Sequence, residues 1–160
     1  MDLSTVLLKQ DTVEKKLELL MREVPYARFI GMQVQTFGQD ILFVLPPLES
    51  NIGNPSLPAI HGGCIGGFME QAALCQVMAT INCSKKPKTV DFSIDYLRPG
   101  RFKPTYARCR VVRQGRQVVN VSVHAWQERR NELVASARCH MLTTKAPESE
   151  VAEKKPSAKA

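Results

Sequence analysis

The chain has 160 residues, 44% of them hydrophobic, and carries a formal net charge of +7. This length suits one compact domain with a single hydrophobic core. The N-terminal segment has neither a basic n-region nor a long apolar run, and no segment of membrane length is free of charge. A secretory signal and a membrane-spanning helix are therefore not expected.

The five cysteines are odd in number and show no CxxC spacing; they are Cys64, Cys75, Cys83, Cys109 and Cys139. Reduced thiols in a reducing compartment fit this pattern better than a disulfide framework or a zinc site. We therefore expect a cytoplasmic protein without a metal site, with an organelle address as the open alternative.

The N-terminal half begins with an amphipathic pattern. Apolar residues at helical spacing predict a helix over residues 12–24 that Pro25 ends. Residues 32–37 and 41–45 predict two strands joined by a turn, and residues 48–58 predict a loop. Residues 1–24 are accordingly interpreted as a helical extension that precedes the main domain, residues 25–144.

The next segment, residues 62–81, is apolar on almost every side and predicts a long buried helix. Glu70 is its only carboxylate. Burial of an unpaired ionised group costs several kcal/mol or shifts its pKa. Glu70 therefore requires a partner, a proton or a function.

The C-terminal half predicts strand after strand. Residues 89–96 alternate, with Val90, Phe92, Ile94 and Tyr96 on one face and Thr89, Asp91, Ser93 and Asp95 on the other. Three further strands are predicted over residues 105–113, 117–126 and 132–142. The charged segment 145–160 is nearly free of large apolar residues, which indicates a disordered tail.

Together these elements predict an α+β fold in which an antiparallel sheet wraps around one long central helix. The edge strands of such a sheet invite pairing with a second copy. We expect a homodimer or a homotetramer, because closed symmetry is the commonest solution.

Two segments resemble the PaaI-like branch of the hotdog-fold thioesterases, enzymes that hydrolyse acyl-coenzyme A. They are IGNPSLPAIHGGCIGGFMEQA, residues 52–72, and TVDFSIDYLRPG, residues 89–100. The HGG motif followed after six residues by an acid is the most specific part, and the similarity spans residues 25–142. The resemblance implies a hotdog fold and hydrolysis of an acyl-CoA to a carboxylic acid and coenzyme A, with no cofactor.

By this resemblance, Gly62 is the oxyanion-hole donor through its backbone N–H, and Glu70 is the catalytic carboxylate. A free N–H at a helix start suits that role, since it combines a hydrogen bond with a favourable dipole. Whether Glu70 activates water or attacks the acyl carbon directly stays open. Gly63 is the neighbouring substrate-binding position, with close packing as its alternative.

Three further residues match supporting positions of the family. Asn54 resembles the loop asparagine that positions the thioester, although Asn51 is an alternative. His61 is the motif histidine, and Thr89 matches a hydroxyl that holds the attacking water from the opposite subunit. Each also has a structural interpretation: a turn-shaping asparagine, a satisfied histidine and an ordinary strand threonine.

Positive charge is concentrated between residues 83 and 116, a segment that contains ten basic and two acidic residues. Such a field attracts polyanions, and the phosphates of coenzyme A are the expected partner. The candidate contacts are Arg98, Arg101, Lys85, Lys86 and Lys88. Nucleic acid is not expected as a partner, because no stacking pattern or recognition helix accompanies these charges.

The main alternative is a non-catalytic acyl-CoA-binding hotdog protein, since the fold also serves binding roles. A carboxylate in the apolar helix favours catalysis, because a binding protein gains nothing from it. A hotdog dehydratase or isomerase is less consistent with the chain, because that chemistry needs a differently placed Asp/His pair on the central helix and no histidine lies between His61 and His124.

Overall fold

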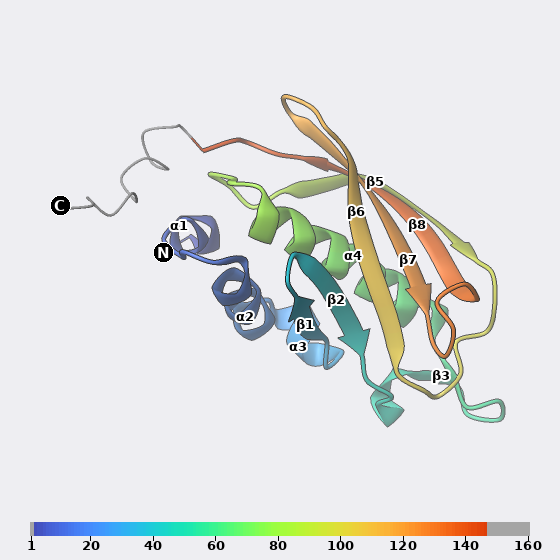
Figure 1. Cartoon of the computed structure of the whole chain (residues 1–160). Coiled ribbons are helices and arrows are strands. Elements are labelled where there is room, and N and C mark those ends of the chain that lie inside the picture. Colours follow the sequence, from blue (N-terminus) through green and yellow to red (C-terminus); the bar gives the residue numbers. More distant parts are fainter. Residues whose placement is uncertain (1, 147–160) are drawn as a thin grey trace.

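The computed structural model describes residues 2–146 of the chain. A long helix, α4 (Gly62–Thr80), lies in the concave face of a curved six-stranded antiparallel sheet (Figure 1). Three shorter helices precede the sheet and lie beside one end of α4. This arrangement confirms the predicted α+β fold with one central helix.

The N-terminal helices are α1 (Leu3–Leu8), α2 (Val13–Glu23) and α3 (Pro25–Phe29). The side chain of Thr12 caps α2 by accepting a hydrogen bond from the Lys15 N–H at 3.3 Å. The helix predicted over residues 12–24 is therefore confirmed, whereas α1 and α3 were not predicted. Pro25 ends α2 and also begins α3, because its fixed φ suits a first helical position.

The N-terminal helices share the core of the main domain. Both α1 and α2 contact α4, and Leu7, Leu17 and Leu20 are at most 3% exposed. The amphipathic face of α2 is thus buried against the central helix, and residues 2–24 pack as part of the same globule.

The first hairpin consists of β1 (Gln33–Phe37) and β2 (Asp40–Leu45). Phe37 lies opposite Asp40, and Gly38 adopts a positive φ of 63°, which suits a residue without a side chain. The predicted loop that follows contains a 3-10 helix, Glu49–Asn51, and a small hairpin of β3 (Ile52–Asn54) and β4 (Ala59–Ile60).

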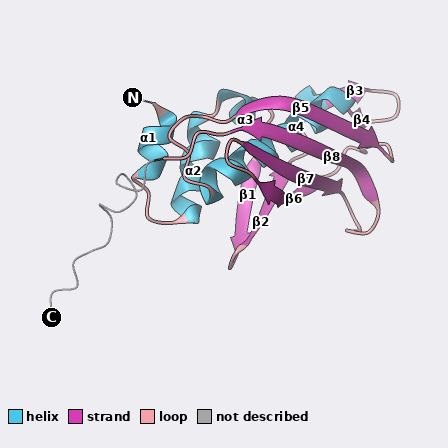
Figure 2. Cartoon of the chain, turned by 90° about the horizontal axis from the view of Figure 1, so that it is seen from above, coloured by secondary structure: helices cyan, strands magenta, loops and turns pink. Residues whose placement is uncertain are grey.

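The remaining strands are β5 (Lys88–Tyr96), β6 (Thr105–Gln114), β7 (Val118–Trp126) and β8 (Leu133–Leu142). The sheet order is β1-β2-β6-β7-β8-β5, so β1 and β5 are its edges (Figure 2). On β7, the residues Val119, Val121, Val123 and Ala125 are fully buried, and the residues between them lie on the outer face.

The central helix is largely enclosed, because most of its surface is apolar. Phe68, Met69, Cys75 and Val77 are fully buried, and α4 contacts β2, β5, β6, β7 and β8 as well as the N-terminal helices. A helix that is apolar all round requires cover on all sides. None of the helices in the described part of the chain is both long and apolar enough to cross a membrane.

One prediction for β5 was wrong, because the strand contains a β-bulge. Thr89 lies opposite Met141 and Asp91 lies opposite His140, which leaves Val90 without a partner. Val90 is 55% exposed. The bulge shifts the alternation by one residue, so Thr89 shares the inner face with Phe92 and not the outer face with Asp91.

The start of the predicted tail is paired with the domain. Lys145 forms a bridge with Cys83, and the Ala146 N–H donates to the Asn82 carbonyl oxygen at 3.1 Å. The rest of the predicted tail, residues 147–160, lies outside the described residues.

Candidate active site

The start of α4 is organised by His61. The Nδ1 atom of its side chain accepts a hydrogen bond from the Gly63 N–H at 2.9 Å. The backbone N–H of His61 donates to the Asn51 carbonyl oxygen at 2.8 Å. His61 is thus the N-cap of the helix. An Nδ1 that accepts leaves the ring proton on Nε2.

Gly62 presents a backbone donor beside this cap. Within residues 2–146 no acceptor takes its N–H, whereas its carbonyl oxygen accepts a hydrogen bond of 2.6 Å from the Tyr96 hydroxyl. The first N–H groups of a helix lack intrahelical acceptors, and the helix dipole favours negative charge there. The Gly62 N–H is therefore available to a carbonyl oxygen that gains negative charge.

Glu70 lies further along α4 and is partly exposed. Its carboxylate forms no hydrogen bond or ion pair with any described residue. The partial exposure lowers the desolvation cost that its apolar sequence context predicts. Glu70 therefore remains open to a substrate or a water molecule.

The glycines of α4 are approached by two tyrosines of the same chain. A methyl group in place of a hydrogen on Gly66 would lie 3.2 Å from the Tyr96 hydroxyl, and one on Gly67 would lie 2.8 Å from Cε1 of Tyr26. Such contacts are tighter than side chains normally tolerate. The absence of side chains at Gly66 and Gly67 thus accommodates Tyr96 and Tyr26.

Tyr26 is a residue of this site that the sequence analysis missed. Burial raises the pKa of its phenol, and the nearby Cys64 and Glu70 raise it further. The phenol therefore stays protonated at neutral pH and can donate a hydrogen bond within electrostatic reach of Glu70. Gly67 was the available signal, because a helical glycine often marks a close approach by a bulky group.

Thr89 and Glu70 both interact with the Cys139 thiol. Burial raises the pKa of the Cys139 thiol to about 11, a hydrogen bond from the Thr89 side chain lowers it, and the charge of Glu70 raises it. The bulge at Val90 is the reason that Thr89 reaches this inner position. Two predicted site residues, Glu70 and Thr89, are thus brought into one neighbourhood.

The two loop asparagines have different environments. Asn51 is buried, and its Nδ2 donates to the Ile30 carbonyl oxygen at 3.0 Å. Asn54 is exposed, and its Oδ1 accepts from the Ser56 N–H at 3.0 Å, as in a side-chain turn. Each side chain supports its own loop, and neither contacts Glu70 among the described residues.

The predicted phosphate contacts fall into two groups. Arg98 and Arg101 line a cleft of about 210 Å³ together with Lys103 and Arg129. This cleft adjoins the start of α4, because the Ile60 N–H donates to the Gly100 carbonyl oxygen. The second group is exposed and lies where the chain runs from the far end of α4 into β5; it consists of Lys85, Lys86 and Lys88.

The cleft also carries negative charge. Lys103 is paired with Glu128, and Arg129 lies 3.5 Å from Glu132. The side chains of Arg98 and Arg101 form no ion pair with a carboxylate among the described residues, although Arg98 donates to the Leu133 carbonyl oxygen at 2.9 Å and Arg101 acts electrostatically on Glu128. No group of three or more potential metal ligands occurs within residues 2–146.

A central helix wrapped by a curved antiparallel sheet defines a hotdog protein, and the free donor at the start of the helix and the carboxylate further along it form its candidate site. The sequence model of the thioesterase superfamily matches residues 57–134. A crystallised protein of Chromobacterium violaceum is 39% identical, with 84% of this chain and 93% of that chain aligned and a TM-score of 0.69.

Two other proteins are similar to this chain. The medium/long-chain acyl-CoA thioesterase YigI of Escherichia coli is 24% identical over 156 residues, which cover 88% of this chain and 99% of the relative. A putative thioesterase of Ralstonia eutropha, described as related to phenylacetic acid degradation, is 22% identical and has the same fold (TM-score 0.68, 79% of this chain and 98% of that chain). The chain belongs to the thioesterase superfamily, which confirms the predicted family and the enzyme class, a thioester hydrolase.

The capping role of His61 leads to a prediction. His61→Ala removes the acceptor for the Gly63 N–H and should lower the free energy of unfolding by about 0.5–2 kcal/mol, as measured by urea denaturation. His61→Asn keeps a good N-cap and should retain both stability and thioester hydrolysis. A stable His61→Asn protein that has lost its turnover would instead identify the imidazole as a catalytic acid or base.

Proposed function

We propose that this protein hydrolyses acyl-CoA thioesters, with the Gly62 N–H as oxyanion-hole donor and Glu70 as general base or nucleophile. The observation that carries the proposal is the free Gly62 N–H at the start of the same helix that presents an unpaired carboxylate. Thioester hydrolysis needs both groups. The N–H stabilises the negative charge that develops on the thioester carbonyl oxygen, and the carboxylate attacks the carbonyl carbon or activates the water that does so.

The spacing of these two groups requires a second subunit. Glu70 follows Gly62 by eight positions, which corresponds to roughly 12 Å along the helix axis. Reacting groups must approach to about 3 Å. One thioester cannot bridge this distance along a single α4, so we infer that the donor of one protomer acts with the carboxylate of another.

The exposed edge of the sheet supports this dimer. β5 is an edge strand, and Val90, Tyr96 and Leu97 are each more than half exposed. Antiparallel pairing of two β5 strands continues the sheet and generates a twofold axis. It also sets the two α4 helices antiparallel, so that the start of one lies opposite the later turns of the other.

The same pairing unites the two groups of cations. It brings the Lys88 end of one β5 next to the Tyr96 end of the other, and therefore Lys85 and Lys86 of one copy toward Arg98 of its partner. We infer that the phosphates of coenzyme A bind there, beside Arg101. Asn54 lies in the loop before α4 and Gly63 lies at the start of α4, and both are proposed to border the entrance to the thioester site.

The acyl group is proposed from the curated relative. The E. coli protein is named as a medium/long-chain acyl-CoA thioesterase, and we infer the same substrate class for this chain. The five thiols are unpaired, and burial raises the pKa of each. Unreactive reduced thiols support the proposed cytoplasmic location.

Glu70→Gln tests the catalytic carboxylate. It should lower kcat for acyl-CoA hydrolysis by about 10²- to 10⁴-fold, measured as release of free thiol. The fold should be retained, because Glu70 is partly exposed and unpaired. Glu18→Gln, an exposed change on α2, is the control. Turnover near that of the wild type would contradict the assignment, and binding without turnover in the wild type would favour a binding protein.

Gly62→Pro tests the donor and the shared site together. Proline removes the N–H but suits a first helical position, and His61 has the φ and ψ of −59° and 130° that a residue before proline adopts. The variant should lose about 10²- to 10³-fold in kcat. Gly62→Ala, which keeps the N–H, is the matched control.

Mixing the two inactive proteins should then restore activity. After subunit exchange, half of the dimers contain one Gly62→Pro and one Glu70→Gln chain, and each has one intact site if the site is shared. We expect about a quarter of the wild-type activity from this twofold arrangement. A site within one protomer predicts no recovery, which would refute the shared site.

Arg101→Gln tests the phosphate contacts. It should raise KM for acyl-CoA by about 3- to 10-fold, as expected for a partly solvated charge contact, and leave KM for the matching acyl-pantetheine unchanged. Arg116→Gln, in the β6–β7 turn, is a control of equal charge. An equal increase in KM for both substrates would show that Arg101 does not contact the nucleotide half.

A further inference from the structure

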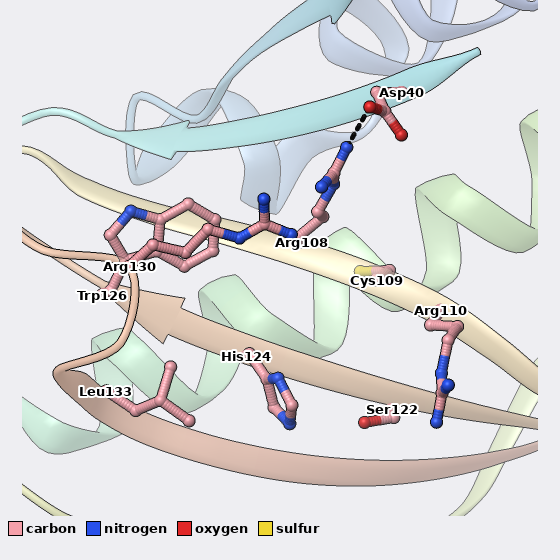
Figure 3. Close-up of a pocket in the computed structure, with 9 residues that line it drawn as sticks. All are labelled: Asp40, Arg108, Cys109, Arg110, Ser122, His124, Trp126, Arg130 and Leu133. Carbon is pink, nitrogen blue, oxygen red and sulfur yellow. Dashed lines mark ion pairs between the residues drawn. The ribbon is translucent and has the colours of Figure 1, made fainter.

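The outer face of the sheet carries a groove that the proposed reaction does not use. It has a volume of about 500 Å³ and lies over β6 and β7, on the side of the sheet away from α4 (Figure 3). On β7 the residues Val123 and Ala125 are fully buried toward the helix, so His124 and Trp126 project outward. The whole thickness of the sheet therefore separates the groove from Glu70.

Arginine side chains dominate the lining of this groove. Arg108 lies opposite His124 in the β6–β7 register, and Arg110 lies opposite Ser122. Arg108 is paired with Asp40, the one carboxylate in the lining among the described residues. Arg110 has no carboxylate partner in the described part of the chain, so the groove retains positive charge that an anion can neutralise.

The other end of the groove is aromatic. The guanidinium of Arg130 lies 5.6 Å from the centroid of the Trp126 ring, and Tyr106 stacks beside the same indole with a centroid separation of 6.2 Å. Figure 3 shows Arg130 extended across Trp126, with His124 between this end and Arg110. Arg130 comes from the β7–β8 loop and has no ion pair among the described residues.

We propose that this groove binds a nucleoside phosphate. The base stacks on Trp126, and the phosphate oxygens accept hydrogen bonds from Arg110 and its neighbours Arg108 and Ser122. Arginine suits phosphate because its guanidinium donates two parallel hydrogen bonds, and bases stack on aromatic side chains and arginine planes. The volume lies within the 300–1,000 Å³ range of small-ligand sites. A free nucleotide and the nucleotide half of a coenzyme A share this chemistry.

Trp126 makes the proposal directly measurable, because it is the single tryptophan of the chain. Titration of the intact protein with ADP or adenosine 3′,5′-bisphosphate should quench its fluorescence in a saturable way, and calorimetry should give the same Kd. Inorganic phosphate and adenosine should each bind more weakly than the whole nucleotide. Rising salt should weaken nucleotide binding.

Arg110→Gln should weaken nucleotide binding about tenfold, the loss expected for one charge-assisted hydrogen bond. Arg116→Gln removes an equal charge from the nearby turn and should bind as the wild type does. Circular dichroism checks that both variants are folded. A silent titration at millimolar nucleotide, or equal binding by the two variants, overturns the proposal.

Kinetics distinguish the two sources of the nucleotide. If the groove holds the nucleotide half of the substrate, Arg110→Gln raises KM for acyl-CoA and leaves acyl-pantetheine unchanged. If it holds a free nucleotide, both KM values stay unchanged while ADP binding is lost. The fluorescence titration requires no turnover, so an inactive Glu70→Gln protein should bind the nucleotide with the same Kd. The nucleotide site can therefore be tested even where the proposed hydrolysis is refuted.

Discussion

The structure depends on one constraint: α4 is apolar over most of its surface, and most of that surface must be covered. A flat sheet covers only one face of a helix, so the sheet curves around α4, and α1 and α2 pack on part of the remaining side. The strand order leaves β5 at an edge of this sheet. The burial of one helix thus determines the architecture and leaves the edge at which a second copy can bind.

The same helix supplies the chemistry. Its start is organised so that the His61 side chain satisfies the Gly63 N–H and leaves the Gly62 N–H free. A cap that satisfied both donors would leave no free N–H for the proposed oxyanion contact. The rise of the helix then sets Gly62 and Glu70 roughly 12 Å apart along its axis, and the proposed twofold axis is the simplest operation that brings such a donor and carboxylate together.

Regular periodicity made most of the fold predictable. Residues 12–24, 62–81 and the strands after residue 88 have clear helical or alternating patterns, and the structure has elements at each of them. The bulge at Val90 was not predictable, because an alternating sequence gives the same pattern with or without an extra residue. The role of Tyr26 was also missed, since its proximity to Gly67 and Glu70 arises only when α3 packs on α4.

The fold places the basic residues of one sequence segment on different surfaces of the protein. Residues 83–116 contain ten cations, but strand alternation and the ends of the strands distribute them over separate surfaces. Arg98 and Arg101 follow β5 and line the cleft at the start of α4, whereas Arg108 and Arg110 have outward positions on β6 and line the groove over Trp126. The cleft and the groove share no lining residue. The two proposed anion sites therefore draw on different arginines of the same stretch of sequence.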